Sequence, residues 1–126
     1  MRVLIADDDR DIVMLLRMAF ETQGHEVLSS YDGIETLQLL AFEPIDAVVL
    51  DVMMPRLDGL TVLAEVRARR ETADLPVVVL TAVRELFDRH QTSYRTRHTH
   101  FVAKPFDAFS LVELVEQMLE EDSAEI

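Results

Sequence analysis

Four short runs of apolar residues recur along the chain, separated by longer segments of mixed character. The runs do not alternate with polar residues, so each predicts a strand that is buried on both faces, as in a parallel sheet covered by helices. They cover residues 3–6, 47–50, 77–80 and 101–103. A shorter run at residues 26–29 predicts a fifth strand at an edge of the sheet.

The segments between these runs carry apolar residues at helical spacing. The clearest stripe predicts a helix with Asp9 as its N-cap and Gly24 as its terminator, and its members are Ile12, Leu15, Leu16, Ala19 and Phe20. Asp32 and Glu35 have the spacing of a capping box, which predicts the start of a second helix. Similar stripes predict helices at residues 60–66, 83–94 and 111–119.

Strands and helices therefore alternate five times within 126 residues, a length that suits one domain with its own core. This alternation predicts an α/β fold with a doubly wound, five-stranded parallel sheet and helices on both faces. We expect the domain to span residues 1–121. Residues 122–126 are expected to form a solvated, acidic C-terminal tail.

The composition and charge of the chain argue against several classes of function. The chain has 24 acidic and 12 basic residues, a net charge of −12, which argues against direct binding of nucleic acid. It has no cysteine, which excludes disulfides, thiolate metal sites and thiol catalysis. Neither a signal peptide nor a run long enough to span a membrane is evident. We therefore expect a cytoplasmic protein with no membrane partner.

Polar side chains follow four of the predicted strands directly. They are Asp7, Asp8, Asp9, Asp51, Thr81 and Lys104. Because the carboxyl ends of parallel strands lie along one edge of a sheet, we expect these side chains to meet in one site. Aspartates that crowd together repel one another unless a cation lies among them. Hard oxygen ligands of this kind suit Mg²⁺.

Such a site has the groups that phosphoryl transfer needs. A carboxylate can attack phosphorus and form an acyl phosphate. The transferring group carries its charge on peripheral oxygens, so it needs cations and a hydroxyl or amide donor around it. Mg²⁺, Lys104 and Thr81 would supply these to a phosphoryl group on Asp51. Lys104 is the only lysine among the 12 basic residues, and a slim ammonium reaches a phosphoryl oxygen more easily than a planar guanidinium.

Together these motifs resemble the response regulator receiver domain, over essentially the whole chain. The matching segments are residues 3–9, residues 46–55 with Asp58 and Gly59, residues 79–82 and residues 102–106. The resemblance implies a flavodoxin-like (βα)5 fold with strand order 2-1-3-4-5. It also implies a role in two-component phosphorelay signalling, in which an aspartyl phosphate switches the binding of partners.

The resemblance further implies a role for each acidic residue of the site. Asp51 would be the phosphoryl acceptor. Asp8 and Asp51 would bind Mg²⁺ directly, Asp7 would act through a metal-bound water, and Met53 would contribute its backbone carbonyl. The chain would then be a phosphoprotein with intrinsic autophosphorylation and autodephosphorylation chemistry only, rather than an enzyme.

The remaining roles concern the switch and the partners. Thr81 would hydrogen-bond the phosphoryl group, and Lys104 would pair with it. Phe101 falls at the switch position that the family couples to Thr81, although it could equally be a plain core aromatic. The phosphoryl donor would be a sensor histidine kinase or a phosphotransfer protein.

Residues 94–100 depart from the family pattern, which is usually rich in small residues there. Several arginines make the surrounding segment basic within an acidic protein, namely Arg84, Arg89, Arg95 and Arg97. They either form a solvated face or, as we expect, belong to a docking face over residues 84–106. The occupant of that face would be an effector protein or a second copy of the chain.

Two other classes of function remain open. A stand-alone phosphatase with an aspartyl-phosphate intermediate usually has a second acid two residues after the nucleophile, where this chain has Met53. An interaction domain that keeps the fold but not the reaction would not need the complete set of acids with Thr81 and Lys104. Flavin binding is disfavoured, because no phosphate loop rich in Gly, Ser or Thr follows the first strand.

Overall fold

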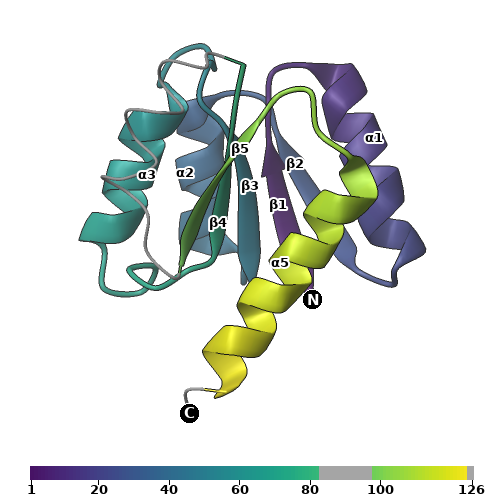
Figure 1. The fold of residues 1–126 in the computed structure, drawn as a ribbon. Coiled ribbons are helices and arrows are strands. Elements are labelled where there is room, and N and C mark those ends of the chain that lie inside the picture. The colour runs from purple at the N-terminus through teal and green to yellow at the C-terminus, as the bar shows by residue number, and fades with distance from the viewer. Residues whose placement is uncertain (83–97, 125–126) are drawn as a thin grey trace.

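The computed structural model of the chain describes residues 1–82 and 98–124. Within these residues, parallel strands form one sheet in the order β2-β1-β3-β4-β5, as predicted (Figure 1). The strands are β1 (Arg2–Ala6), β2 (Glu26–Ser30), β3 (Ala47–Asp51), β4 (Val77–Thr81) and β5 (Thr99–Ala103). The doubly wound, flavodoxin-like topology is therefore confirmed.

Helices cover both faces of the sheet (Figure 1). They are α1 (Arg10–Thr22), α2 (Gly33–Phe42), α3 (Gly59–Ala68) and α5 (Ala108–Ala124). Helices α1 and α5 pack together on one face, and α2 and α3 pack together on the other. The helix predicted at residues 83–94 lies outside the described residues. Among the described helices, none combines the length and the apolar character that a bilayer crossing requires.

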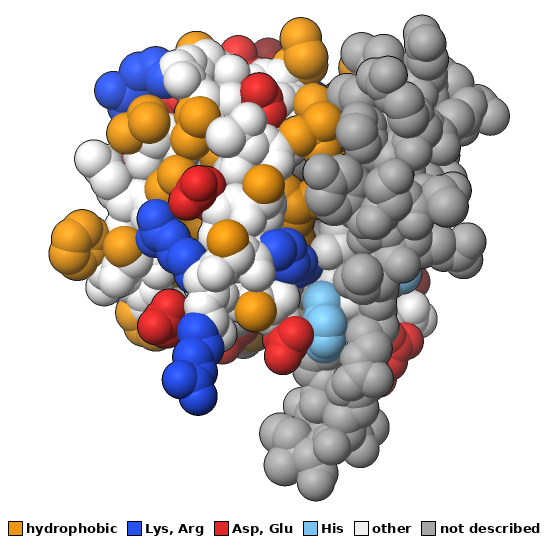
Figure 2. Space-filling model, turned by 90° about the vertical axis from the view of Figure 1, so that its left-hand side faces the viewer, with side chains coloured by type: hydrophobic (Ala, Val, Ile, Leu, Met, Phe, Trp, Pro, Cys, Tyr) orange, Lys and Arg blue, Asp and Glu red, His pale blue; other side chains and the backbone are white. Residues whose placement is uncertain are grey.

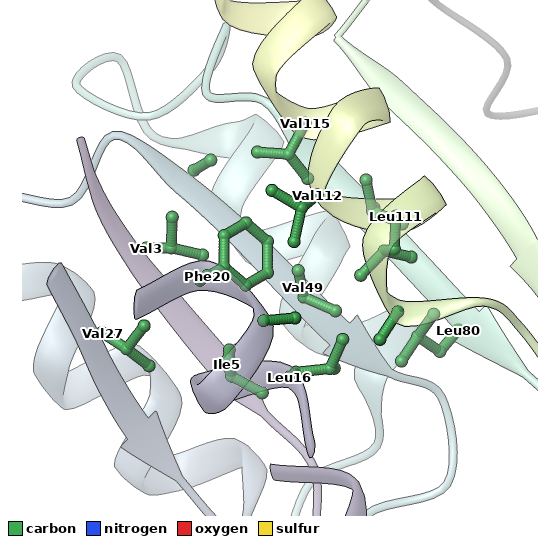
Figure 3. Packing of buried hydrophobic residues seen from close by; sticks show 14 of the residues in the cluster. Val3, Ile5, Leu16, Phe20, Val27, Val49, Leu80, Leu111, Val112 and Val115 are labelled. Atoms are coloured by element: carbon green, nitrogen blue, oxygen red, sulfur yellow. The ribbon is translucent and has the colours of Figure 1, made fainter. Parts of the chain in front are cut away.

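Each strand sends alternate side chains to opposite faces, which divides the core in two. Val3 and Ile5 of β1 face α1 and α5, whereas Leu4 and Ala6 face α2 and α3. On the first face the ring of Phe20 is fully buried, and Figure 3 shows it among Val3, Val49 and Val112. The central strands are buried on both faces, as their continuous apolar runs predicted.

The apolar stripe predicted for α1 is partly wrong. Leu15 was expected to face the core, but it is 50% exposed, and Val13 is buried instead. Successive helical residues are rotated by about 100°, so a core face centred on Leu16 and Phe20 includes Val13 and turns Leu15 toward solvent. Consequently α1 presents Met14, Leu15 and Met18 on its outer surface.

Side-chain caps begin the helices near the edge of the sheet where the strands end. Asp9 accepts hydrogen bonds from the backbone N–H groups of Asp11 and Ile12, so the predicted N-cap of α1 is confirmed. The carboxylates of Asp32 and Asp58 cap α2 and α3 in the same way. These caps hold the turns that follow β1, β2 and β3.

The outer surfaces of α2 and α3 are mixed in character. Figure 2 views the molecule from the side that α3 occupies in Figure 1, and hydrophobic side chains there lie among charged ones. Phe42, the last residue of α2, is 84% exposed. A cavity of about 210 Å³ lies between the two helices, with Leu37, Leu40 and Val66 in its lining.

Candidate functional site

The predicted site residues meet at the carboxyl ends of the strands. Asp7 and Asp8 follow β1, and Asp51 is the last residue of β3. One carboxylate oxygen from each of these three residues lies within 4.8 Å of the other two. The sequence prediction that separate acidic residues converge on one site is therefore confirmed.

Lys104 and Thr81 stand at the same edge. The Lys104 ammonium donates hydrogen bonds to Asp51 Oδ1 at 3.1 Å and to Asp7 Oδ2 at 3.3 Å. Thr81 is buried at the end of β4, and its backbone carbonyl accepts a hydrogen bond from the Lys104 N–H at 2.8 Å. The strand ends thus place a cation against two carboxylates and a threonine beside it.

Backbone hydrogen bonds hold Asp7 in place. The Asp7 side chain accepts a hydrogen bond from the Asp9 N–H at 2.9 Å, and the Asp7 N–H donates to the Ser30 carbonyl at 3.1 Å. The Met53 backbone lowers the pKa of the Asp51 carboxylate, against the effect of burial. Asp7 and Asp51 are both buried, whereas Asp8 is exposed and leaves one side of the cluster open to solvent.

Burial and mutual repulsion shift the proton affinity of these groups. Burial, followed by the nearby charge of Asp7, raises the pKa of Asp51 to about 6, against the opposing effect of Lys104. Burial also raises the pKa of Asp7, although the Asp9 N–H and Lys104 oppose it. Burial disfavours the ammonium of Lys104, but the charges of Asp51 and Asp7 outweigh this effect and raise its pKa.

The cluster suits a divalent cation. Lys104 neutralises at most one of the three carboxylates, so the cluster with its lysine keeps a net negative charge when all are ionised. Carboxylate oxygens are the ligands that Mg²⁺ prefers, and the open side at Asp8 leaves room for the water molecules that this ion retains. The residues present therefore fit the predicted metal.

The roles predicted for Met53 and Phe101 remain predictions, because the contacts of these residues do not test them. The Met53 side chain is 63% exposed, and its carbonyl remains a predicted ligand. Phe101 is buried in β5 opposite Val79 and packs in the core that α2 and α3 cover. That position is compatible with a switch and with a core aromatic alike. The predicted docking face over residues 84–106 lies largely outside the described residues.

The comparisons with known proteins agree with this geometry. A model of the response regulator receiver domain matches residues 3–116. Response regulator MprA of Mycobacterium avium (strain 104) is 40% identical over 118 residues, which are 94% of this chain and 49% of that protein. The receiver domain of a Francisella response regulator is 30% identical with a TM-score of 0.83, over 96% of this chain and 98% of that chain.

A further similar structure is the receiver domain of a sensor histidine kinase from Pseudomonas aeruginosa PAO1. It has a TM-score of 0.82 over 94% of this chain and 97% of that chain. That protein holds a magnesium ion in its active-site cleft, but at 24% identity the likeness shows the fold alone. The chain spans about half the length of the MprA proteins that it matches.

Proposed function

We propose that Asp51 is the phosphoryl acceptor of this chain, because the chain belongs to the response regulator receiver domain family of two-component signalling. In this role the Asp51 carboxylate accepts a phosphoryl group in a reaction that depends on Mg²⁺. The observation that carries the proposal is the convergence of Asp7, Asp8 and Lys104 on a buried aspartate at the end of β3.

In the proposed reaction, an Asp51 oxygen attacks phosphorus and forms a new P–O bond. The bond between phosphorus and the donor breaks, and the donor leaves with its electron pair. When bound, Mg²⁺ supplies positive charge to the phosphoryl oxygens, and its ligands would be Asp8, Asp51 and the Met53 carbonyl, with Asp7 acting through a water molecule. A cation also opposes the repulsion that raises the pKa of Asp51, so it favours the ionised nucleophile.

Lys104 and Thr81 would complete the site around the phosphoryl group. The Lys104 ammonium already contacts Asp51 Oδ1, so a short movement would let it pair with a phosphoryl oxygen. The Thr81 hydroxyl would donate a hydrogen bond to the same group. Rearrangement of Thr81 and Phe101 on phosphorylation would shift the population of conformations that bind partners.

The partners in this proposal follow from the family. A sensor histidine kinase or a phosphotransfer protein donates the phosphoryl group, and an effector or a second copy of the chain binds the face at residues 84–106. The described part of the chain would work in the cytoplasm and would not contact nucleic acid directly. It would carry out its own phosphorylation and dephosphorylation without acting on a separate substrate as an enzyme does.

The proposal is tested by mass spectrometry of the intact protein after incubation with Mg²⁺ and a small acyl phosphate. We expect the wild type to gain one phosphoryl group and Asp51→Asn to gain none. Asp107→Asn is the matched control, because Asp107 caps α5 through the Ser110 N–H and asparagine caps equally well. The proposal would be contradicted if neither a small acyl phosphate nor a phosphorylated histidine donor labels Asp51.

A further inference from the structure

The loop that follows Asp51 contains a strained turn. Arg56 has a φ of +66°, in the left-handed region that residues other than glycine rarely adopt. The Leu57 N–H donates a hydrogen bond to the Pro55 carbonyl at 2.7 Å, which closes a tight turn around Arg56. A three-residue turn with a positive φ at its centre is rare and persists only where its surroundings hold it.

An ion pair with the start of α2 holds this turn. Nη2 of Arg56 donates to both carboxylate oxygens of Asp32, each at 2.9 Å. Asp32 is itself held, because its carboxylate caps α2 by accepting a hydrogen bond from the Glu35 N–H at 2.8 Å. The Gly33 N–H adds a longer hydrogen bond of 3.4 Å to the Pro55 carbonyl. The turn is thus attached to a rigid helix terminus.

Close packing transmits the position of this turn to Asp51. A Cβ atom on Gly33 would lie 2.0 Å from the Leu57 carbonyl oxygen, so the start of α2 touches the loop backbone. At the other end, a Cβ atom on Gly59 would lie 2.1 Å from the Asp51 carbonyl oxygen. The Gly59 N–H also donates to the Val52 carbonyl at 2.8 Å. The start of α2, the loop and the end of β3 are therefore in close backbone contact.

We propose that the Asp32–Arg56 ion pair positions the Mg²⁺ site. It holds the loop of residues 52–58, and with it the Met53 backbone, in the conformation that binds the ion. The inference rests on the proposed function, in which the Met53 carbonyl is a metal ligand. Asp32 and Arg56 touch neither the metal nor the phosphoryl group, so both are positioning residues.

Because the pair is partly exposed, a role in positioning the loop can be distinguished from a general contribution to stability. The side chains of Arg56 and Asp32 are 59% and 18% exposed, and an ion pair of that kind contributes little to the free energy of unfolding. Its effect should therefore be local. Loss of the pair should weaken Mg²⁺ binding and leave the phosphorylation rate at saturating Mg²⁺ close to that of the wild type.

Two variants break the pair without breaking the elements that it joins. Asp32→Ser keeps a side-chain oxygen for the N-cap of α2 but cannot reach Arg56. Arg56→Asn tolerates the left-handed conformation but cannot reach Asp32. Arg56→Lys keeps the charge and serves as the conservative rescue. The matched control is Arg69→Gln, which removes an exposed pair with Glu65 in α3.

The measurement is the Mg²⁺ dissociation constant, determined by calorimetry without any phosphoryl donor. We expect it to rise two- to fivefold in Asp32→Ser and in Arg56→Asn, to rise no further in the double variant, and to recover partly in Arg56→Lys. Arg69→Gln should bind Mg²⁺ as the wild type does. The Mg²⁺ concentration for half-maximal phosphorylation should shift in parallel, without loss of the maximal rate.

The inference is overturned if both single variants bind Mg²⁺ as tightly as the wild type, if their effects add in the double variant, or if the wild type binds no Mg²⁺. If the variants bind Mg²⁺ more weakly than the wild type but no donor phosphorylates Asp51 in the wild type, the positioning role stands and the proposed function fails.

Discussion

The two ends of the parallel sheet differ in how their charged side chains are arranged. Where the strands end, the carboxylates of Asp7, Asp8 and Asp51 crowd within 4.8 Å of one another, with the Lys104 ammonium against two of them. Where the strands begin, Arg67 lies within hydrogen-bonding distance, 2.6 to 3.3 Å, of five uncharged oxygens in the described part of the chain. One end concentrates like charges, and the other surrounds a cation with acceptors.

Other charges where the strands begin are also matched with partners. Arg2 contacts Glu26 at 3.3 Å and Glu43 at 3.4 Å. His25 Nε2 lies 2.8 Å from Glu116 Oε2. These contacts join elements that are distant in the sequence, and because the side chains are partly exposed each contributes little to the free energy of unfolding. The opposite end leaves a repulsion that an added cation can relieve, which is the property a metal-dependent site requires.

The largest effect is expected where Arg67 is replaced. Arg67→Met keeps the apolar stem but leaves several partly buried oxygens without their charged donor, which costs about 4 kcal/mol in the free energy of unfolding. Urea denaturation measures this loss. Mg²⁺ binding by the folded fraction should not change, and Arg69→Gln, with only an exposed pair, should stay within about 0.5 kcal/mol of the wild type. A change in Mg²⁺ affinity would show that the two ends are coupled.

The second prediction concerns Asp51 in protein free of divalent ions. Its pKa is raised from 3.8 to about 6 in the folded state, so between these values the folded protein binds more protons than the unfolded chain. Stability therefore falls as the pH rises through this window, by about 3 kcal/mol for the whole shift. Asp51→Asn removes this dependence, so it should gain stability relative to the wild type between pH 4 and pH 7.

Urea denaturation in EDTA across that pH range measures the difference between the two proteins. Addition of Mg²⁺ should remove most of it, because the cation relieves the repulsion in the wild type. A difference that stays constant from pH 4 to pH 8 would show that Asp51 is not destabilised by burial and like charge.

The acidic end could be predicted from sequence for a specific physical reason. Its side chains follow directly after buried strands, and parallel topology brings strand ends together whatever the intervening sequence. Asp51, Thr81 and Lys104 were placed in this way, and the structure brings them to one edge. Their chemical roles, the Met53 carbonyl ligand and the Phe101 switch remain predictions.

The features that sequence analysis missed depend on tertiary contacts. The acceptors of Arg67 include the His98 carbonyl, 31 residues away, and no spacing rule marks such a residue. Arg56 adopts a left-handed turn that its residue type disfavours, so propensity pointed away from it. Leu15 was misplaced because apolar residues on α1 exceed what one buried face accommodates. Each miss reflects packing that overrides local preference.

The third prediction removes the cation from the acidic end. In protein without divalent ions, Lys104→Gln should lower the free energy of unfolding at pH 8 by about 2 kcal/mol, because Asp7 and Asp51 lose a charged hydrogen-bond donor. The loss should shrink below pH 5, where Asp51 is protonated. Denaturation curves at both pH values measure it. An equal loss at both would mean that Lys104 contributes through packing alone.

The smallest effect is expected for Glu116→Gln, which keeps the shape of the side chain and weakens its contact with His25. Glu116 is 38% exposed, so the loss in the free energy of unfolding should stay below about 1 kcal/mol, and Mg²⁺ affinity should not change. The Asp32–Arg56 pair is comparably exposed, yet it should alter Mg²⁺ affinity with a similarly small change in stability. Calorimetry and denaturation of the two variants, Glu116→Gln and Asp32→Ser, compare the pairs directly. If both pairs affect Mg²⁺ binding equally, the contrast between the two ends of the sheet fails; if only Asp32→Ser does, location decides what an exposed ion pair contributes.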